Sequence, residues 1–189
     1  MLQAGDLNRA FETYWNEMHQ CRTAKAYWAL LHVTVCIPDI CAALESQNGE
    51  ATPASYKAWC GQYLIDPLLS ASERYRIRCK ILHQGRATTD QPSRYTAFAF
   101  GQPSETGEVD HKRVIETVLH LDVGELAREM KSAVEEWIRT IEERSSSAAA
   151  MNVERNLQSL VRVKRTVVRP KTFRGGGSTF VVAKTTSNY

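Results

Sequence analysis

The stretch SASERYRIRCKILHQG, from Ser70 to Gly85, is the most informative part of this sequence. Ser70 and Glu73 have the spacing of a capping box, which marks the start of a helix. Gly85 suits the left-handed conformation found just beyond a helix end, so the pattern predicts a helix that ends close to His83. Four cations lie along this helix: Arg74, Arg76, Arg78 and Lys80.

A histidine among cations indicates chemistry on an anion. Histidine titrates near neutral pH, so His83 can both accept and donate a proton. RNA phosphate is the natural candidate, because the ribose 2′-hydroxyl is a built-in nucleophile that needs only a base and charge stabilisation. In the alternative interpretation, His83 caps helix carbonyls and the arginines form a solvated face. The sequence leaves both open.

Length and cysteine usage indicate the general class of the protein. The 189 residues suit one domain with an appendage. Five cysteines without a CxxC pair favour reduced thiols in the cytoplasm over disulfides or a zinc site. The first residues do not resemble a signal peptide. The apolar segment 26–44 contains His32, Pro38 and Asp39, which favours a buried helix over a membrane span. We therefore expect a cytoplasmic protein with no membrane partner.

The charge is distributed unevenly along the chain. Residues 151–189 contain eight Lys and Arg but one Glu, whereas residues 1–150 contain sixteen Lys and Arg against twenty Asp and Glu. A basic arm can follow a phosphate backbone, or it can pair with a partner protein or a second subunit. Six of its cations are candidate RNA contacts: Arg162, Lys164, Arg165, Arg169, Lys171 and Arg174.

Hydrophobic periodicity predicts a mainly α fold. Helices are expected over about 6–20, 23–46, 53–64, 70–84 and 122–144, with a kink or break in the second near Pro38. Two β-like runs, 95–100 and 114–121, are expected to pair as a hairpin inserted among the helices. A low-complexity linker over 145–150 divides the chain into a helical domain, 1–145, and a linker with a basic arm, 146–189. The arm has two further β-like runs, 157–168 and 179–184, which predict either a hairpin or a disordered segment.

The spacing from Arg78 to His83 is R-x4-H, and together with the helical pattern it resembles the HEPN superfamily. These are small helical bundles whose enzymatic members are metal-independent ribonucleases. The run RYRIRCKILHQG, followed by the predicted hairpin and a closing helix with a Trp, resembles an uncharacterised bacterial HEPN-like group. The resemblance covers residues 1–145.

The resemblance implies a HEPN-like bundle in which Arg78 and His83 are catalytic. His83 would act as acid or base toward the 2′-hydroxyl or the 5′-oxygen, and Arg78 would bind the phosphate. No metal or cofactor is implied. A homodimer would place two such helices face to face. A toxin or antiviral effector is the implied role, with RNA as substrate and an antitoxin or effector protein as a further partner.

Helix geometry alone nominates a different arginine. On an ideal helix Arg78 and His83 point about 140° apart, whereas Arg76 and His83 differ by about 20°. Arg76 and Lys80 are therefore additional candidate RNA-binding residues on the His83 side. Two other functions stay open: a non-catalytic HEPN-like module that dimerises or binds a partner, and a nucleic-acid-binding regulator that acts through its basic arm.

Overall fold

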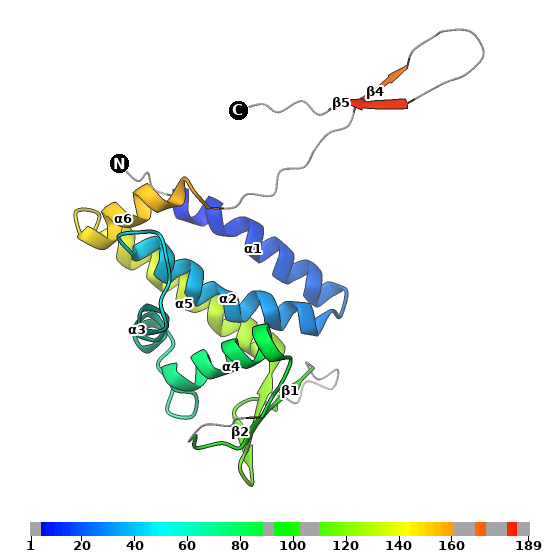
Figure 1. Cartoon of the computed structure of the whole chain (residues 1–189), viewed down its shortest axis with the longest axis vertical. Helices are drawn as coiled ribbons and strands as arrows, with labels where there is room; N and C mark the ends of the chain where they lie inside the picture. The colour runs from blue at the N-terminus through cyan, green and yellow to red at the C-terminus, as the bar shows by residue number, and fades with distance from the viewer. Residues whose placement is uncertain (1–4, 89–92, 103–109, 161–168, 173–180, 185–189) are drawn as a thin grey trace.

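The computed structural model describes residues 5–88, 93–102, 110–160, 169–172 and 181–184. This part of the chain is mainly helical, as predicted, with six helices and a small three-stranded sheet (Figure 1). The helices are α1 (Asp6–Thr23), α2 (Tyr27–Glu45), α3 (Pro53–Tyr63), α4 (Ala71–Gln84), α5 (Val123–Glu143) and α6 (Ala148–Leu157). The strands are β1 (Ala97–Gly101), β2 (Arg113–Ile115), β3 (Val118–Asp122), β4 (Arg169–Thr172) and β5 (Val181–Lys184).

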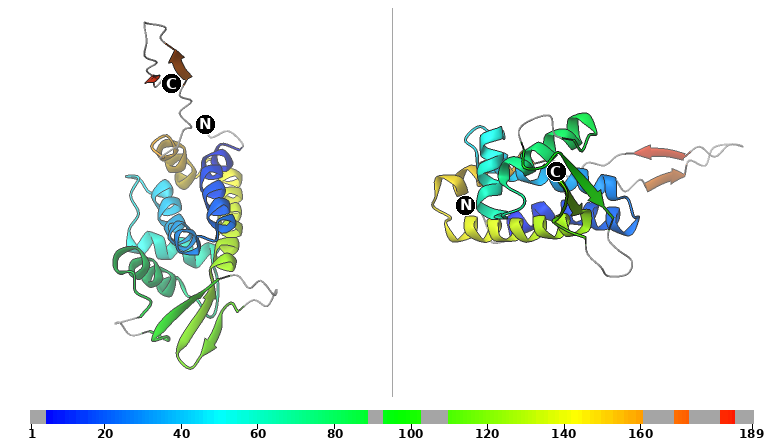
Figure 2. Two further views of the ribbon diagram at one scale, coloured as in Figure 1. Left: turned by 90° about the vertical axis from the view of Figure 1, so that its right-hand side faces the viewer. Right: turned by 90° about the horizontal axis from the view of Figure 1, so that it is seen from below.

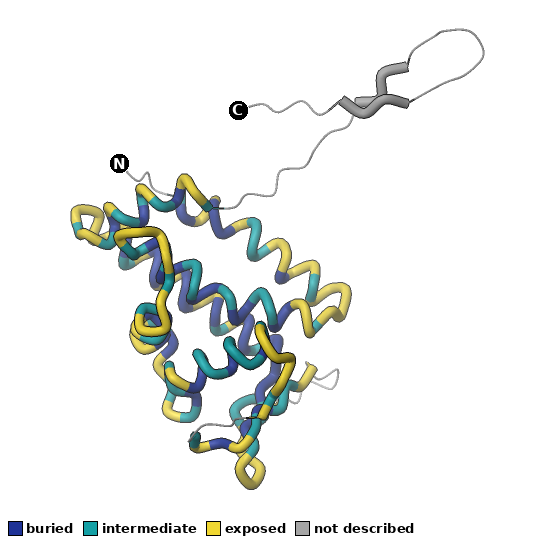
Figure 3. Tube along the Cα trace, in the orientation of Figure 1, coloured by how far each residue is buried: buried dark blue, intermediate teal, exposed yellow. Residues whose placement is uncertain are grey.

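Helix α2 is the central element of the body and contacts every other helix. By length and composition alone it could cross a membrane, and half of its apolar window is buried inside the protein. Buried residues recur along α2 and α5 (Figure 3). Pro38 lies inside α2 without ending it, so of the two predicted alternatives the break is wrong and the kink stays a prediction. Pro38 is itself buried, and packing of this helix against its neighbours outweighs the backbone hydrogen bond that proline removes.

Helix α4 forms as its sequence predicts. The Ser70 hydroxyl accepts a hydrogen bond from the Glu73 amide, and the Glu73 carboxylate accepts one from the Ser70 amide at 2.8 Å. Gly85 ends the helix with a φ of 58°, a conformation that glycine adopts without steric cost. α4 contacts α2 and α3 and lies between α3 and the sheet (Figure 1).

The sheet differs from the predicted hairpin. The run 114–121 contains two strands, because Glu116 takes a left-handed φ of 55° and the chain turns back between β2 and β3. β3 then pairs antiparallel with β2 and parallel with β1, in the order β1-β3-β2. The central strand β3 buries Leu119 and Leu121 completely. The hairpin therefore lies within one predicted run rather than between the two.

The second half of the predicted linker 145–150 is the start of helix α6, which begins at Ala148. Ala150, Val153 and Leu157 are buried in the main core. The side-chain amide of Asn152 donates to the Glu45 carbonyl at 2.8 Å, which caps the last turn of α2. Alanine is the best helix former, so a Ser/Ala run of low complexity can still be an ordered helix. The folded body thus extends past the predicted boundary at 145.

The sheet and α6 lie at opposite ends of the helical body (Figures 1 and 2). In the basic arm, β4 and β5 pair antiparallel, with Arg169 opposite Lys184 and Thr172 opposite Val181. β5 lies within the predicted β-like run 179–184, but β4 lies beyond the run 157–168 and contains Pro170, so the strand that pairs with β5 is not the predicted one. Of the run 157–168, Leu157 belongs to α6, and residues 161–168 lie outside the described residues.

Candidate functional site

The two residues of the R-x4-H pattern contact each other on the surface of α4. A guanidinium nitrogen of Arg78, Nη1, lies 3.1 Å from Nε2 of His83. Arginine has only N–H donors, so Nε2 must be the acceptor in this contact and Nδ1 carries the ring proton. His83 is exposed to solvent in the last turn of the helix. The imidazole is therefore accessible to solvent while it contacts Arg78.

The contact shows that side-chain reach lets Arg78 meet His83 although the two residues leave the helix on different sides. The angular argument predicted Arg76, because Arg78 leaves the helix on a different side. However, the arginine side chain is long enough to curve along the helix surface toward the end of α4. The structure brings Arg78 to His83 and places Arg76 in a neighbouring groove.

An acidic residue that the sequence did not nominate holds Arg78 in place. Asp39, on α2, accepts a hydrogen bond from Nε of Arg78 at 2.7 Å. Burial works against the charge of Arg78, but the hydrogen bond and the charge of Asp39 outweigh it and raise the Arg78 pKa. The signal in the sequence was a carboxylate in the middle of a mainly apolar helix.

Two side chains beside this site remain protonated at neutral pH. A hydrogen bond with Cys79 is the main reason that the pKa of Tyr75 is raised, and burial adds to it. Burial also raises the pKa of the Cys36 thiol, followed by the negative charge of Asp39. Cys36 is therefore not a thiolate nucleophile here. We call Asp39, Arg78 and His83 the Arg78 site.

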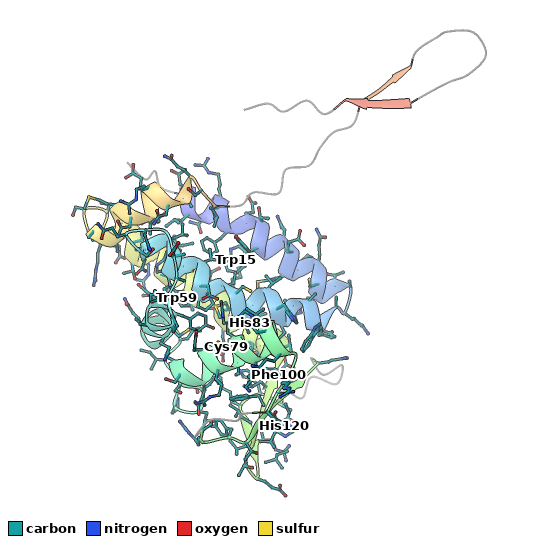
Figure 4. All side chains as sticks on the ribbon, in the orientation of Figure 1. Trp15, Trp59, Cys79, His83, Phe100 and His120 are labelled. Atoms are coloured by element: carbon teal, nitrogen blue, oxygen red, sulfur yellow. The ribbon has the colours of Figure 1, made fainter. Side chains whose placement is uncertain are left out.

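A groove between α3 and α4 adjoins the Arg78 site. It has a volume of about 500 Å³ and is lined by Lys57, Ser72, Tyr75, Arg76, Cys79, Lys80 and Gln84. Figure 4 shows Cys79, one of these residues, on the same helix as His83. Both additional RNA-binding candidates on α4, Arg76 and Lys80, thus line one groove. We call it the α3–α4 groove.

One cation of α4 has a structural role instead. Arg74 is only 7% exposed, and its guanidinium lies 3.6 Å from the Glu129 carboxylate of α5. Lys112 pairs with Glu129 and also with Asp66, at 2.5 Å. His111 accepts a hydrogen bond from the Asp122 amide through Nδ1 at 3.1 Å, and its Nε2 lies 3.2 Å from Glu129.

These ion pairs and hydrogen bonds, which we call the Glu129 cluster, join α4, α5 and the chain before β2 through Arg74, His111, Lys112 and Glu129. Burial opposes the charge of Glu129, but hydrogen bonds from His111 and Lys112 lower its pKa to about 2. No local sequence pattern predicted the cluster, because its members are far apart along the chain. It anchors α4 and leaves Arg74 unavailable to a ligand.

Several predicted residues lie elsewhere. Arg162, Lys164, Arg165 and Arg174 fall outside the described residues, and for Arg169 and Lys171 the structure describes only the strand β4 in which they lie. Among the described residues, no group of three His, Cys, Asp or Glu is placed to hold a metal ion. Comparisons of the chain with protein-family models, with curated proteins and with solved structures found no match.

Proposed function

We propose that this protein is a HEPN-like, metal-independent endoribonuclease that cleaves RNA at the Arg78 site. The observation that carries the proposal is the guanidinium of Arg78, which contacts both Asp39 and the exposed imidazole of His83. A base with a free path to solvent and a fixed cation beside it are the two groups that attack by a 2′-hydroxyl requires.

The contact between Arg78 and His83 in the protein without RNA supports the following order of events. An incoming phosphate competes for the Arg78 guanidinium, whose planar fork matches two phosphate oxygens. Arg78 then releases Nε2 of His83, and the lone pair becomes free to accept the 2′-hydroxyl proton. Asp39 keeps the guanidinium near the site through its Nε, which leaves the Nη atoms for the phosphate.

The reaction balances without a co-reactant. The 2′-oxygen gives its proton to a base and bonds to phosphorus, the bond from phosphorus to the 5′-oxygen breaks, and the departing oxygen takes a proton. The products are a 2′,3′-cyclic phosphate and a 5′-hydroxyl. One neutral imidazole cannot be base and acid in the same step, so we propose a homodimer in which the partner's copy of α4 supplies the second histidine.

The cellular setting of the proposal follows from the same resemblance. We propose a cytoplasmic toxin or antiviral effector, held inactive or directed by an antitoxin or another protein. The positive charge of residues 151–189 supports a further, sequence-independent contact with RNA.

Cleavage of a labelled RNA in the presence of EDTA tests the proposal. We expect the wild-type protein to form 2′,3′-cyclic phosphate ends and His83→Ala to lower the rate by about 10²-fold or more, as loss of an acid–base group does. His19→Ala, an exposed histidine of α1 away from the site, is the matched control and should leave the rate unchanged. Equal cleavage by His83→Ala and wild type would remove the proposal.

One observation favours a second candidate, a non-catalytic partner-binding module. Asp39 and His83 together already satisfy much of the Arg78 guanidinium within a single chain, as in an ordinary structural ion pair. In that case RNA stays intact with every variant, and analytical ultracentrifugation or a pull-down with the full chain reveals a dimer or a bound protein.

A further inference from the structure

We propose that the α3–α4 groove binds one unpaired nucleotide of a single-stranded RNA, with its base on Tyr75 and its flanking phosphates on Lys57, Arg76 and Lys80. The inference rests on the proposed function, since it names the form of RNA that reaches the Arg78 site. It assigns roles to Lys57 and Tyr75, which no feature of the sequence nominated.

The charge of the groove selects an anion. Three of its lining residues are cations, and no Asp or Glu of the described chain lines it. Lys57 comes from α3, whereas Arg76 and Lys80 lie one turn apart on the same face of α4. Cations on two walls can contact phosphates on both sides of a nucleotide. The volume of about 500 Å³ falls within the ordinary range of small-molecule sites.

Tyr75 supplies the aromatic surface that distinguishes a nucleotide from other anions. The ring of Tyr56 packs against Tyr75 edge-on, at 5.3 Å between centroids, and holds it in place. Nζ of Lys57 lies over the Tyr75 ring at 5.3 Å from its centroid. Base stacking on an aromatic ring is stronger than a cation–π contact at an exposed site, so a base can displace Lys57 toward a phosphate.

The groove borders the Arg78 site through Tyr75 and Cys79. The Arg78 guanidinium lies 6.0 Å from the centroid of Tyr75, on whose surface the base would stack. Nη1 of Arg78 is also 3.9 Å from the sulfur of Cys79, which lines the groove. A nucleotide on Tyr75 therefore places its neighbouring phosphate beside Arg78 and His83.

This arrangement requires an unpaired strand. Bases inside an A-form duplex are stacked on each other, and their faces cannot reach a protein ring. A loop or a single strand can turn one base into the groove. Every base has a face that stacks, so we expect a preference for single strands with little sequence preference.

Fluorescence anisotropy with the full-length His83→Ala protein and a labelled single-stranded oligoribonucleotide tests the inference without cleavage. Adding Tyr75→Leu should weaken binding by about tenfold, whereas Tyr75→Phe should stay within about twofold, because the ring is kept. Lys57→Ala and Lys80→Ala should each weaken binding and lower the salt slope by about one. Lys131→Ala on α5, a lysine outside the groove, is the control and should bind as the parent does.

The outcomes test RNA binding in the groove separately from RNA cleavage at the Arg78 site. Unchanged affinity in folded Tyr75→Leu and Lys57→Ala proteins would overturn the inference, even if the wild type cleaves RNA. Equal binding of single strand and duplex, or competition by polyglutamate as strong as by unlabelled RNA, would also overturn it. Tyr75-dependent binding by a protein whose wild type leaves RNA intact would support the groove and reject the proposed nuclease.

Discussion

At the scale of single residues, Asp39 determines how Arg78 faces His83. The carboxylate binds Nε, on the edge of the guanidinium, and so turns Nη1 toward the imidazole. Both side chains of this ion pair are partly exposed, at 21% for Arg78 and 23% for Asp39. Solvent weakens such a pair, so its contribution is to position Arg78 rather than to stabilise the fold.

We therefore expect Asp39→Asn to affect activity more than stability. Asparagine keeps the shape of the aspartate side chain but lacks its negative charge, so Arg78 is held less firmly. We expect the cleavage rate to fall by about tenfold, which corresponds to about 1.4 kcal/mol in activation free energy. The free energy of unfolding should change by less than about 1 kcal/mol. Urea unfolding alongside the RNA cleavage assay measures both. A large loss of stability with full activity would contradict this role.

The charge of Glu129 contributes to the stability of the folded protein. Its pKa in the folded protein is about 2, below the usual 4.5, because His111 and Lys112 hold the charged form despite burial. A carboxylate whose pKa is lowered by folding stabilises the folded state. The full contribution is present at pH values above the pKa that the carboxylate has in the unfolded chain. That contribution is lost as the pH falls from about 4.5 toward 2.

Glu129→Gln should remove this acid-sensitive contribution. At neutral pH the variant should be less stable than the wild type by about 1–2 kcal/mol, which is less than about 1.36 kcal/mol for each unit of pKa would give, because solvent screens the partly exposed carboxylate. The difference should shrink as the pH falls toward about 2, where about half of the wild-type carboxylate is protonated. Urea unfolding at both pH values measures it. A difference that does not depend on pH would show that the charge of Glu129 is not the cause.

At the scale of elements, the two ends of α4 set the position of His83. The capping box at Ser70 begins the helix, and Gly85 ends it directly after the turn that carries the imidazole. Gly85 has a φ of 58°, and a Cβ added there would have no atom within 4 Å. Glycine is therefore needed at this position for its backbone conformation and not for lack of space. Gly61, inside α3, has no such requirement, and an added Cβ would touch Ala71 at an ordinary 4.0 Å.

Two glycine substitutions should therefore have opposite effects. Gly85→Ala should destabilise the protein by about 1 kcal/mol, because an L-residue resists the left-handed conformation. Gly61→Ala should stabilise it by about 0.5–1 kcal/mol, because alanine is the better helix residue. Thermal unfolding of the two variants beside the wild type measures the signs, and a shift in the same direction for both would contradict the argument.

At the scale of the whole molecule, α6 completes the helical body. It buries three apolar side chains in the core that also contains Trp137 of α5. Its Asn156 amide donates to three carbonyls at the end of α2: those of Ala43, Leu44 and Ser46. The last carbonyls of a helix have no partner within it, so α6 satisfies groups that α2 cannot.

Truncation tests where the folded body ends. A chain that stops at Arg144 should lose about 5 kcal/mol, since it exposes the core that Val153 and Leu157 cover. Its melting temperature should fall by about 10–20 °C. A chain that stops at Leu160 keeps α6 and should melt close to the full-length protein. Similar melting of both truncated chains would place the boundary at 145 after all.

Local sequence patterns are enough to predict the ends of α4 and the buried stripe of α5. Ser70, Glu73 and Gly85 act within a few residues of one another, so the start and end of α4 follow from their spacing. The hydrophobic stripe of α5 likewise follows from helical periodicity. The choice of Arg78 as the partner of His83 came from a resemblance, because helix angles alone favoured Arg76.

Packing of the folded chain, in contrast, sets which distant groups meet. Asp39 and Arg78, or Glu129 and Lys112, are brought together by packing of separate elements, and no local pattern records such pairs. The same holds for β3, which pairs parallel with β1, and for α6, whose order depends on the core beneath it. Short-range interactions determine helices and turns, whereas burial and long-range pairing form the site and the limits of the fold.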